Sequence, residues 1–333
     1  LKRLGLRQAP SGARRVLPDV EAAMKVLITG ASGMLGRSLM RLLSADPETY
    51  QVVGTGLTRA EPPLRRLDLT DEGSARAILD ELRPDFVVHC AAERDPDRAD
   101  QDPEGVLKLN VAASGTMARL CVEHNATIIY ISTDYVFDGG VVTEVLPPYG
   151  VDAPTEPVNF YGRSKRDGEL AILAEGGPVA LTLRVPVLYA QDCKDVSESA
   201  SLIVAKSLLK TGEQTVDDWG VRFPTSVDDV AVVLKAILDL KAKDASSVSG
   251  ILHCSSGEFI TKYRMAIMMA EILELPSDHL RPDPNPPAGA PRPQNTQLDC
   301  SATWAALGFE HSFTPLRSGL ESALRSFKET CKA

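Results

Sequence analysis

The chain has 333 residues, enough for a large α/β domain and a smaller lobe around a continuous apolar core. Its formal net charge of -9 argues against a general nucleic-acid binder, and no apolar run approaches the roughly 18 residues that span a bilayer. The six cysteines contain no Cys-x-x-Cys pair and make no metal-ligand spacing with the five histidines. We therefore expect a cytoplasmic protein with reduced thiols and no structural metal site.

The first 23 residues differ from the rest of the chain. They contain basic residues at positions 2, 3, 7, 14 and 15 and acidic residues only at 19 and 21, without apolar periodicity. Met24 stands directly before the first predicted strand. We expect residues 1–23 to be a disordered basic leader, or translated upstream sequence with Met24 as the true start. An organelle transit peptide, which is also arginine-rich, is the alternative.

From Lys25 onward, short apolar runs typical of strands alternate with helical patterns. The predicted strands cover residues 26–29, 51–54, 86–90, 127–132 and 179–185, and the predicted helices cover 34–44, 74–82, 105–123 and 161–174. Such alternation predicts βαβ units and a parallel sheet with helices on both faces. The fold class is therefore α/β, with a Rossmann-type doubly wound parallel sheet in residues 24–190.

The pattern changes after Tyr189. Predicted helices at 199–210, 228–240, 262–273 and 315–328 surround one predicted strand at 250–254 and a proline-rich stretch at 281–287. We expect residues 191–333 to form a smaller lobe, partly interleaved with the first domain, that supplies the other wall of a cleft. The proline-rich stretch is expected to be a surface loop.

Three glycines follow the first predicted strand directly, at Gly30, Gly33 and Gly36. Glycine permits a tight turn, a close approach of the backbone to a pyrophosphate, and close packing of the next helix on the strand. A helix that begins at Met34 would present unpaired N–H groups and the positive end of its dipole to phosphates. This position favours a dinucleotide site over a plain strand-turn-helix.

The end of the second strand indicates which dinucleotide is bound. Residues 54–59 contain no acidic residue where NAD sites place one for the ribose 2′-OH. Arg59 is positioned to meet a 2′-phosphate, so NADP(H) is favoured and 24–190 is an NADP-binding domain; a solvated surface arginine is the alternative. Asp68, at the end of a third predicted strand, could accept from the adenine amino group, unless the region caps a helix through Thr70 or Asp71.

A reductase pattern lies further along the chain. Tyr161 and Lys165 stand at i and i+4 on one predicted helix face, and Thr133 ends a buried strand at the sheet edge where ligands bind. A ketone that accepts a hydride needs a proton donor. Tyr161 would donate that proton, Lys165 would lower its pKa and bind the nicotinamide ribose, and Thr133 would hold the carbonyl in line.

These residues lie in two stretches that resemble the dTDP-4-dehydrorhamnose reductase family of extended short-chain reductases: STDYVFDG at 132–139 and NFYGRSK at 159–165. The wider spacing of the glycines is also similar to that group, and the resemblance runs from about residue 25 to 318. Within the family, the closer resemblance is to the regulatory (beta) subunits of methionine adenosyltransferase. It is carried by HCAAER at 89–94, RFPT at 222–225, TKY at 261–263, HLRP at 279–282 and QLDC at 297–300. Positions shared by the whole family are the alternative explanation.

This resemblance implies a protein that binds NADP(H) and docks on the catalytic subunit of methionine adenosyltransferase, modulating S-adenosylmethionine synthesis. The cofactor contacts that it implies are Ser32, Gly33, Met34, Leu35, Arg59, Asp68, Leu69, Cys90, Arg94, Tyr161 and Leu188, to which the reasoning above adds Gly30, Gly36 and Lys165. The alternative is an NADPH-dependent reductase of a nucleotide sugar that uses Thr133, Tyr161 and Lys165.

Glu93-Arg94 stands where the sugar reductases have Tyr-Thr, which favours the regulatory hypothesis. Two departures from the beta subunits accompany the resemblance. Thr58 stands where animal beta subunits have a second arginine, so the grip on a 2′-phosphate is expected to be weaker. Residues 326–333 stand where those subunits carry a longer basic and aromatic tail.

Overall fold

The computed structural model describes residues 23–193, 196–325 and 327, so the predicted leader lies outside the described residues except for its last position. Within the described chain, seven strands form one sheet in the order β10-β6-β5-β4-β1-β2-β3, and every neighbouring pair is parallel. They are β1 (Met24–Thr29), β2 (Tyr50–Gly56), β3 (Arg65–Arg66), β4 (Phe86–His89), β5 (Thr127–Thr133), β6 (Leu181–Val185) and β10 (Gly250–His253). The predicted doubly wound α/β fold is confirmed, with the strand order reversing between β1 and β4.

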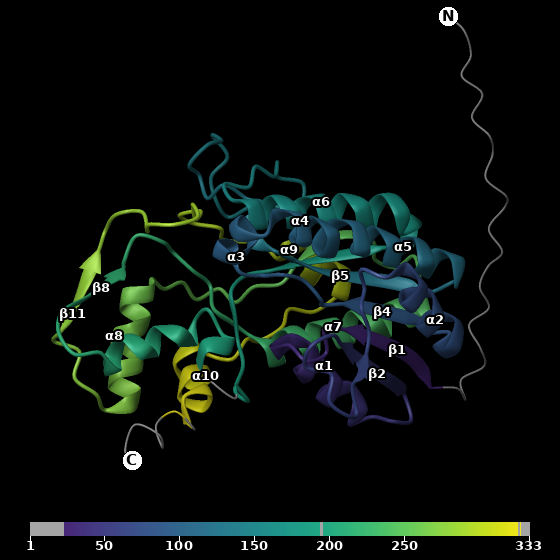
Figure 1. Ribbon diagram of the computed structural model, residues 1–333, viewed down its shortest axis with the longest axis horizontal. Helices are drawn as coiled ribbons and strands as arrows, with labels where there is room; N and C mark the ends of the chain where they lie inside the picture. The colour runs from purple at the N-terminus through teal and green to yellow at the C-terminus, as the bar shows by residue number, and fades with distance from the viewer. Residues whose placement is uncertain (1–22, 194–195, 326, 328–333) are drawn as a thin grey trace, which may run out of the picture.

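Helices cover both faces of this sheet (Figure 1). On one face lie α1 (Met34–Ser44) and α7 (Val227–Lys243); on the other lie α2 (Glu72–Leu82), α5 (Ala113–Glu123) and α6 (Phe160–Glu175). The strands send alternate side chains into the two layers, because successive residues of a strand point to opposite faces. In β1, Val26 and Ile28 pack with α1 and α7, whereas Leu27 packs with α2 and α5.

The C-terminal half adds further elements at one end of the molecule (Figure 1). A 3-10 helix at Leu202–Leu209 and α8 (Lys262–Leu273) pack beside a two-stranded parallel sheet of β8 (Gln214–Asp217) and β11 (Leu280–Asp283). Short strands β7 (Leu188–Tyr189) and β9 (Thr225–Ser226) pair in parallel, and α9 (Ser301–Leu307) and α10 (Leu316–Ala323) complete this half. This half also contributes α7 and β10 to the large sheet domain, so the two halves are interleaved.

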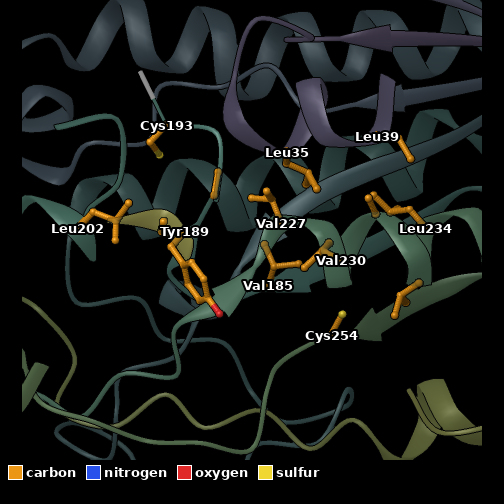
Figure 2. Packing of buried hydrophobic residues seen from close by; sticks show 14 of the residues in the cluster. Leu35, Leu39, Val185, Tyr189, Cys193, Leu202, Val227, Val230, Leu234 and Cys254 are labelled. Atoms are coloured by element: carbon orange, nitrogen blue, oxygen red, sulfur yellow. The ribbon is translucent and has the colours of Figure 1, made fainter. Parts of the chain in front are cut away.

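One apolar cluster joins the halves. Figure 2 shows Leu35 of α1 near Val227 of α7 and Leu39 of α1 near Leu234 of α7; Tyr189 belongs to the same cluster. Because these side chains share one buried core, the position of the second half is fixed against the glycine-rich turn that precedes α1.

Several predicted elements differ in extent or type. The predicted helix 105–123 is divided into α4 (Pro103–Leu107), a π-helix (Lys108–Ala112) and α5, and the predicted helix 199–210 is a shorter 3-10 helix. The stretch expected as a loop at 281–287 contributes β11, where Pro282 is tolerated because the strand has a partner on one side only. The third strand ends at Arg66, not at Asp68, and β6 begins at Leu181 after a 3-10 turn at Gly177–Val179. α10 covers Leu316–Ala323, and the predicted helix end at residue 328 lies outside the described residues. No helix among the described residues is long and apolar enough to cross a membrane.

Candidate functional site

A cavity of about 1040 Å³ lies at the carboxyl ends of the central strands, and both halves of the chain line it. The structure brings all the predicted site residues to its wall: Gly30, Ser32, Gly33, Met34, Leu35, Gly36, Arg59, Asp68, Leu69, Cys90, Arg94, Thr133, Tyr161, Lys165 and Leu188. Its size suits a large ligand, and its position is the one at which open α/β sheets bind ligands.

The glycine-rich turn leaves space only for bare backbone. Gly30 has a φ of +66°, and a Cβ placed there would lie 2.7 Å from the amide nitrogen of Ala91. A Cβ on Gly36 would lie 2.6 Å from the Cα of Ala31, so α1 packs directly on the turn. Gly33 is the N-cap residue of α1 and has no side chain to accept from the first amides of the helix. These amides can therefore bind an anionic group in the cavity.

The sequence left open whether the acidic residues after β3 bind adenine or cap a helix, and the structure gives the two residues different contacts. Asp71 caps α2 by accepting from the amides of Gly73 and Ser74 at 3.2 and 3.3 Å. Asp68 does not cap the helix; it accepts from the hydroxyl and amide of Thr70, which hold its pKa below the ordinary value. Asp68 lines the cavity, so its contact with an adenine stays a prediction.

Tyr161 and Thr133 face the cavity from two different elements. Thr133 ends β5, and its Oγ1 accepts from the amide of Tyr135 at 3.2 Å. Tyr161 lies in the first turn of α6, whose N-cap, Asn159, accepts from the amide of Gly162 at 2.7 Å. The rings of Tyr135 and Tyr161 are edge to face at 6.1 Å between centroids. The end of β5 and the start of α6 thus meet at the same part of the cavity wall.

The amine of Lys165 contacts β5. Its Nζ donates to the carbonyl of Ile131 in β5 at 2.8 Å and lies 3.9 Å from the centre of the Tyr130 ring. Burial lowers the pKa of Lys165 to about 7. Burial also raises the pKa of Tyr161, and the Thr133 hydroxyl only partly opposes this effect. The prediction that Lys165 lowers the pKa of Tyr161 is therefore not met, because the amine is buried against β5.

Glu93 and Arg94, which stand where the sugar reductases have Tyr-Thr, contact backbone groups rather than each other's side chains. The Glu93 carboxylate accepts from the backbone amides of Arg94 and Asp95 at 2.9 Å each. The buried Asn110, presented by the π-helix, donates to the Glu93 carbonyl at 2.9 Å and to Ser164 Oγ at 3.0 Å. This network fixes the segment after β4 to α6. The Arg94 guanidinium donates instead to the main-chain carbonyl of Glu198 in the second half of the chain. A π-helical turn at such a position is common beside functional sites.

Sequence reasoning missed a cationic group that the C-terminal half adds to the wall, formed by Arg222, Lys262 and Arg292. Arg222 is buried and donates to the carbonyls of Val221 and Pro293 at 2.8 and 3.2 Å. Burial, and then the charge of Arg222, lower the pKa of Lys262. The sequence motifs RFPT and TKY contain the first two of these residues, but no local sequence pattern indicates that the three lie close together.

Asp134 is the acidic neighbour of this group. Its carboxylate accepts from the hydroxyl of Thr296, and burial raises its pKa to about 6, with Arg222 opposing the shift. A second acid missed from the sequence, Glu198, lines the cavity at the end of a short 3-10 helix, Val196–Glu198. The described residues contain no group of three His, Cys, Asp or Glu side chains arranged to hold a metal ion.

Comparisons with known proteins agree with this architecture. Residues 24–329 match the family model described as the RmlD substrate binding domain. The chain belongs to this family. A Xenopus laevis relative named methionine adenosyltransferase 2 subunit beta is 40% identical over 97% of this chain and 94% of its own length. A relative from Mycolicibacterium smegmatis, named dTDP-4-dehydrorhamnose reductase, is 32% identical over 95% of this chain and 88% of its own length.

Solved structures named as dTDP-4-dehydrorhamnose reductases are also similar. A hypothetical dTDP-4-dehydrorhamnose reductase from Sulfolobus tokodaii is 28% identical, with a TM-score of 0.74 over 89% of this chain and 99% of that chain. The Bacillus anthracis dTDP-4-dehydrorhamnose reductase, solved in complex with NADP, shares the fold with a TM-score of 0.75 at 24% identity, over 92% of this chain and 99% of its own. The resemblance expected from the sequence, to the reductase family and to the beta subunits within it, is confirmed.

Proposed function

We propose that this chain binds NADP(H) in the cavity and acts in the cytoplasm as a regulatory subunit that docks on the catalytic subunit of methionine adenosyltransferase, modulating S-adenosylmethionine synthesis. The observation that carries the proposal is the 40% identity, over nearly the whole of both chains, to a protein named as a beta subunit of that enzyme. The identity to the named reductase is lower, at 32%.

The cavity supports the dinucleotide part of the proposal. The first amides of α1 would hold the pyrophosphate, Arg59 the 2′-phosphate and Asp68 the adenine amino group. Tyr161 and Lys165, which line the same cavity, would contact the nicotinamide ribose. NADP(H), when bound, supplies a hydride donor or acceptor. In the regulatory role, its binding stabilises the folded, docking-competent chain by mass action.

The test is complex formation with a methionine adenosyltransferase catalytic subunit. Co-expressed or mixed at micromolar concentrations, the two proteins should elute together on size exclusion, and the rate of S-adenosylmethionine synthesis should change. Tyr161→Phe should leave both results unchanged, because docking does not need the phenolic hydroxyl. Two separate peaks, with an unchanged rate, would contradict the proposal.

A second function is favoured by the cationic group in the same cavity. Arg222, Lys262 and Arg292 line the wall that Tyr161 and Thr133 also line, and they would suit the negative charge of a nucleotide-sugar substrate. A reductase would then use the Tyr161 hydroxyl to protonate the substrate oxygen while Thr133 holds it. This function predicts NADPH oxidation with dTDP-4-dehydro-6-deoxy sugars, abolished by Tyr161→Phe. Absence of turnover across a panel of such sugars would exclude it.

A further inference from the structure

Three arginines from separate parts of the first domain converge on Glu198. Arg37, in the second turn of α1, donates from Nη2 to Glu198 Oε2 at 2.8 Å. Arg59, between β2 and β3, lies with its Nη1 3.6 Å from Glu198 Oε1. Arg94, after β4, donates to the Glu198 main-chain carbonyl at 2.7 Å. Two of these arginines, Arg59 and Arg94, are residues that the sequence assigned to the cofactor.

The Glu198 carboxylate is held firmly in this position. Its side chain is 17% exposed, whereas the Arg59 side chain is 61% exposed. Arg37 also donates to the main-chain carbonyl of Ser32 in the glycine-rich turn at 3.0 Å, so its guanidinium links that turn to Glu198. Asp192 also contacts α1: its carboxylate lies 2.8 Å from Arg41 Nη1 and 3.8 Å from Arg37 Nη2. The Glu198 carboxylate therefore stands beside the phosphate-binding turn and in contact with Arg59.

This arrangement bears on the ribose end of a dinucleotide. A 2′-phosphate would need the Arg59 guanidinium, which the Glu198 carboxylate already approaches, and the two anions would repel each other at that distance. A ribose 2′-OH would instead find an acceptor in the same carboxylate. In NAD sites that acceptor is an acid at the end of the second strand, and residues 54–59 lack one.

We propose that Glu198 is the specificity-determining acid of this site: its carboxylate competes with the 2′-phosphate for Arg37 and Arg59 and sets the preference between NADPH and NADH. The inference rests on the proposed dinucleotide binding. It extends that function by placing the determinant in the C-terminal half of the chain, outside the strand end where such an acid is usually found.

The test measures dissociation constants of NADPH and NADH by nicotinamide fluorescence for the wild-type chain and Glu198→Gln. The amide keeps the size of the side chain and removes its charge. NADPH should bind about tenfold more tightly to the variant, while NADH changes by less than about threefold or binds more weakly. In an Arg59→Ala background, the same change should give a gain below about threefold.

Asp228→Asn is the matched control, because it also removes a carboxylate from an arginine of α1, Arg41, but does not line the cavity. The NADPH-to-NADH ratio should stay within about twofold in this control. An unchanged ratio in Glu198→Gln, or an equal change in both variants, would overturn the inference and leave the proposed function standing. If the wild-type chain binds neither reduced dinucleotide, the proposed function fails, and this inference fails with it.

Discussion

Lys165→Met tests how a buried amine beside the candidate site affects stability. The Lys165 side chain is 1% exposed, and burial lowers its pKa from 10.5 to about 7. The difference of about 3.5 pH units corresponds to roughly 4–5 kcal/mol of destabilisation of the folded state near neutral pH. The hydrogen bond to the carbonyl of Ile131 and the cation-π contact with the Tyr130 ring each stabilise the folded state by about 1 kcal/mol. We therefore expect Lys165→Met to raise the free energy of unfolding by about 2–3 kcal/mol at pH 7.

The sign of the pH dependence follows from the depressed pKa. Between pH 7 and pH 10.5 the unfolded chain binds the lysine proton more tightly than the folded chain does. Stability contributed by Lys165 is thus lost as the pH falls through this window and regained as it rises. Above pH 10.5 the amine is neutral in both states. The advantage of the methionine variant should accordingly shrink toward pH 10 and reverse by about 1 kcal/mol, the value of the lost hydrogen bond.

Urea unfolding at pH 7 and pH 10 measures the free energy of unfolding of the variant and of the wild type. The contributions of other titrating groups cancel in the difference between the two proteins. Lys243→Met, at an exposed position of α7, is the control and should change stability by less than about 0.5 kcal/mol. A Lys165→Met variant that is no more stable than wild type at pH 7, with a difference that does not vary with pH, would refute the reasoning. NADPH affinity should meanwhile decrease, since the variant lacks the donor proposed for the nicotinamide ribose.

Three further substitutions test separate parts of the site. Gly36→Ala should abolish NADPH binding and destabilise the fold, because its Cβ would lie 2.6 Å from backbone atoms; Gly257→Ala, with open space around it, should change neither in the same titration and melting experiment. Arg59→Ala should weaken NADPH binding about tenfold and NADH binding much less, and an equal loss for both would contradict a contact with the 2′-phosphate. Asp71→Ala removes the N-cap of α2 and should lower the free energy of unfolding by about 1 kcal/mol in urea. NADPH affinity should remain unchanged in that variant, and a loss would place Asp71 in the site.

Local patterns predicted the elements whose ends are set by local interactions. α1 and α8 have the bounds expected from the sequence, since each follows a clear start signal: glycine at Gly33 and a side-chain cap at Thr261. The helix expected over 105–123 is less regular, because buried Asn110 must reach both Glu93 and Ser164, and a π-helical turn provides that register. Propensity carries no information about such a tertiary requirement.

In the candidate site, too, the residues placed by local structure were predictable, whereas those placed by tertiary packing were not. The glycines, Thr133 and Tyr161 were predictable because their positions depend on one strand end and one helix start. Lys165 was placed on the correct helix face, yet the spacing does not determine which neighbour its amine meets, and the packing of α6 on β5 directs it to Ile131. Glu198 reaches the cavity only through the interleaving of the two halves, in which a shared apolar core sets a distant segment against α1. The charge that meets Arg59 therefore depends on tertiary packing, so the absence of an acid from residues 54–59 was insufficient to determine which dinucleotide the site prefers.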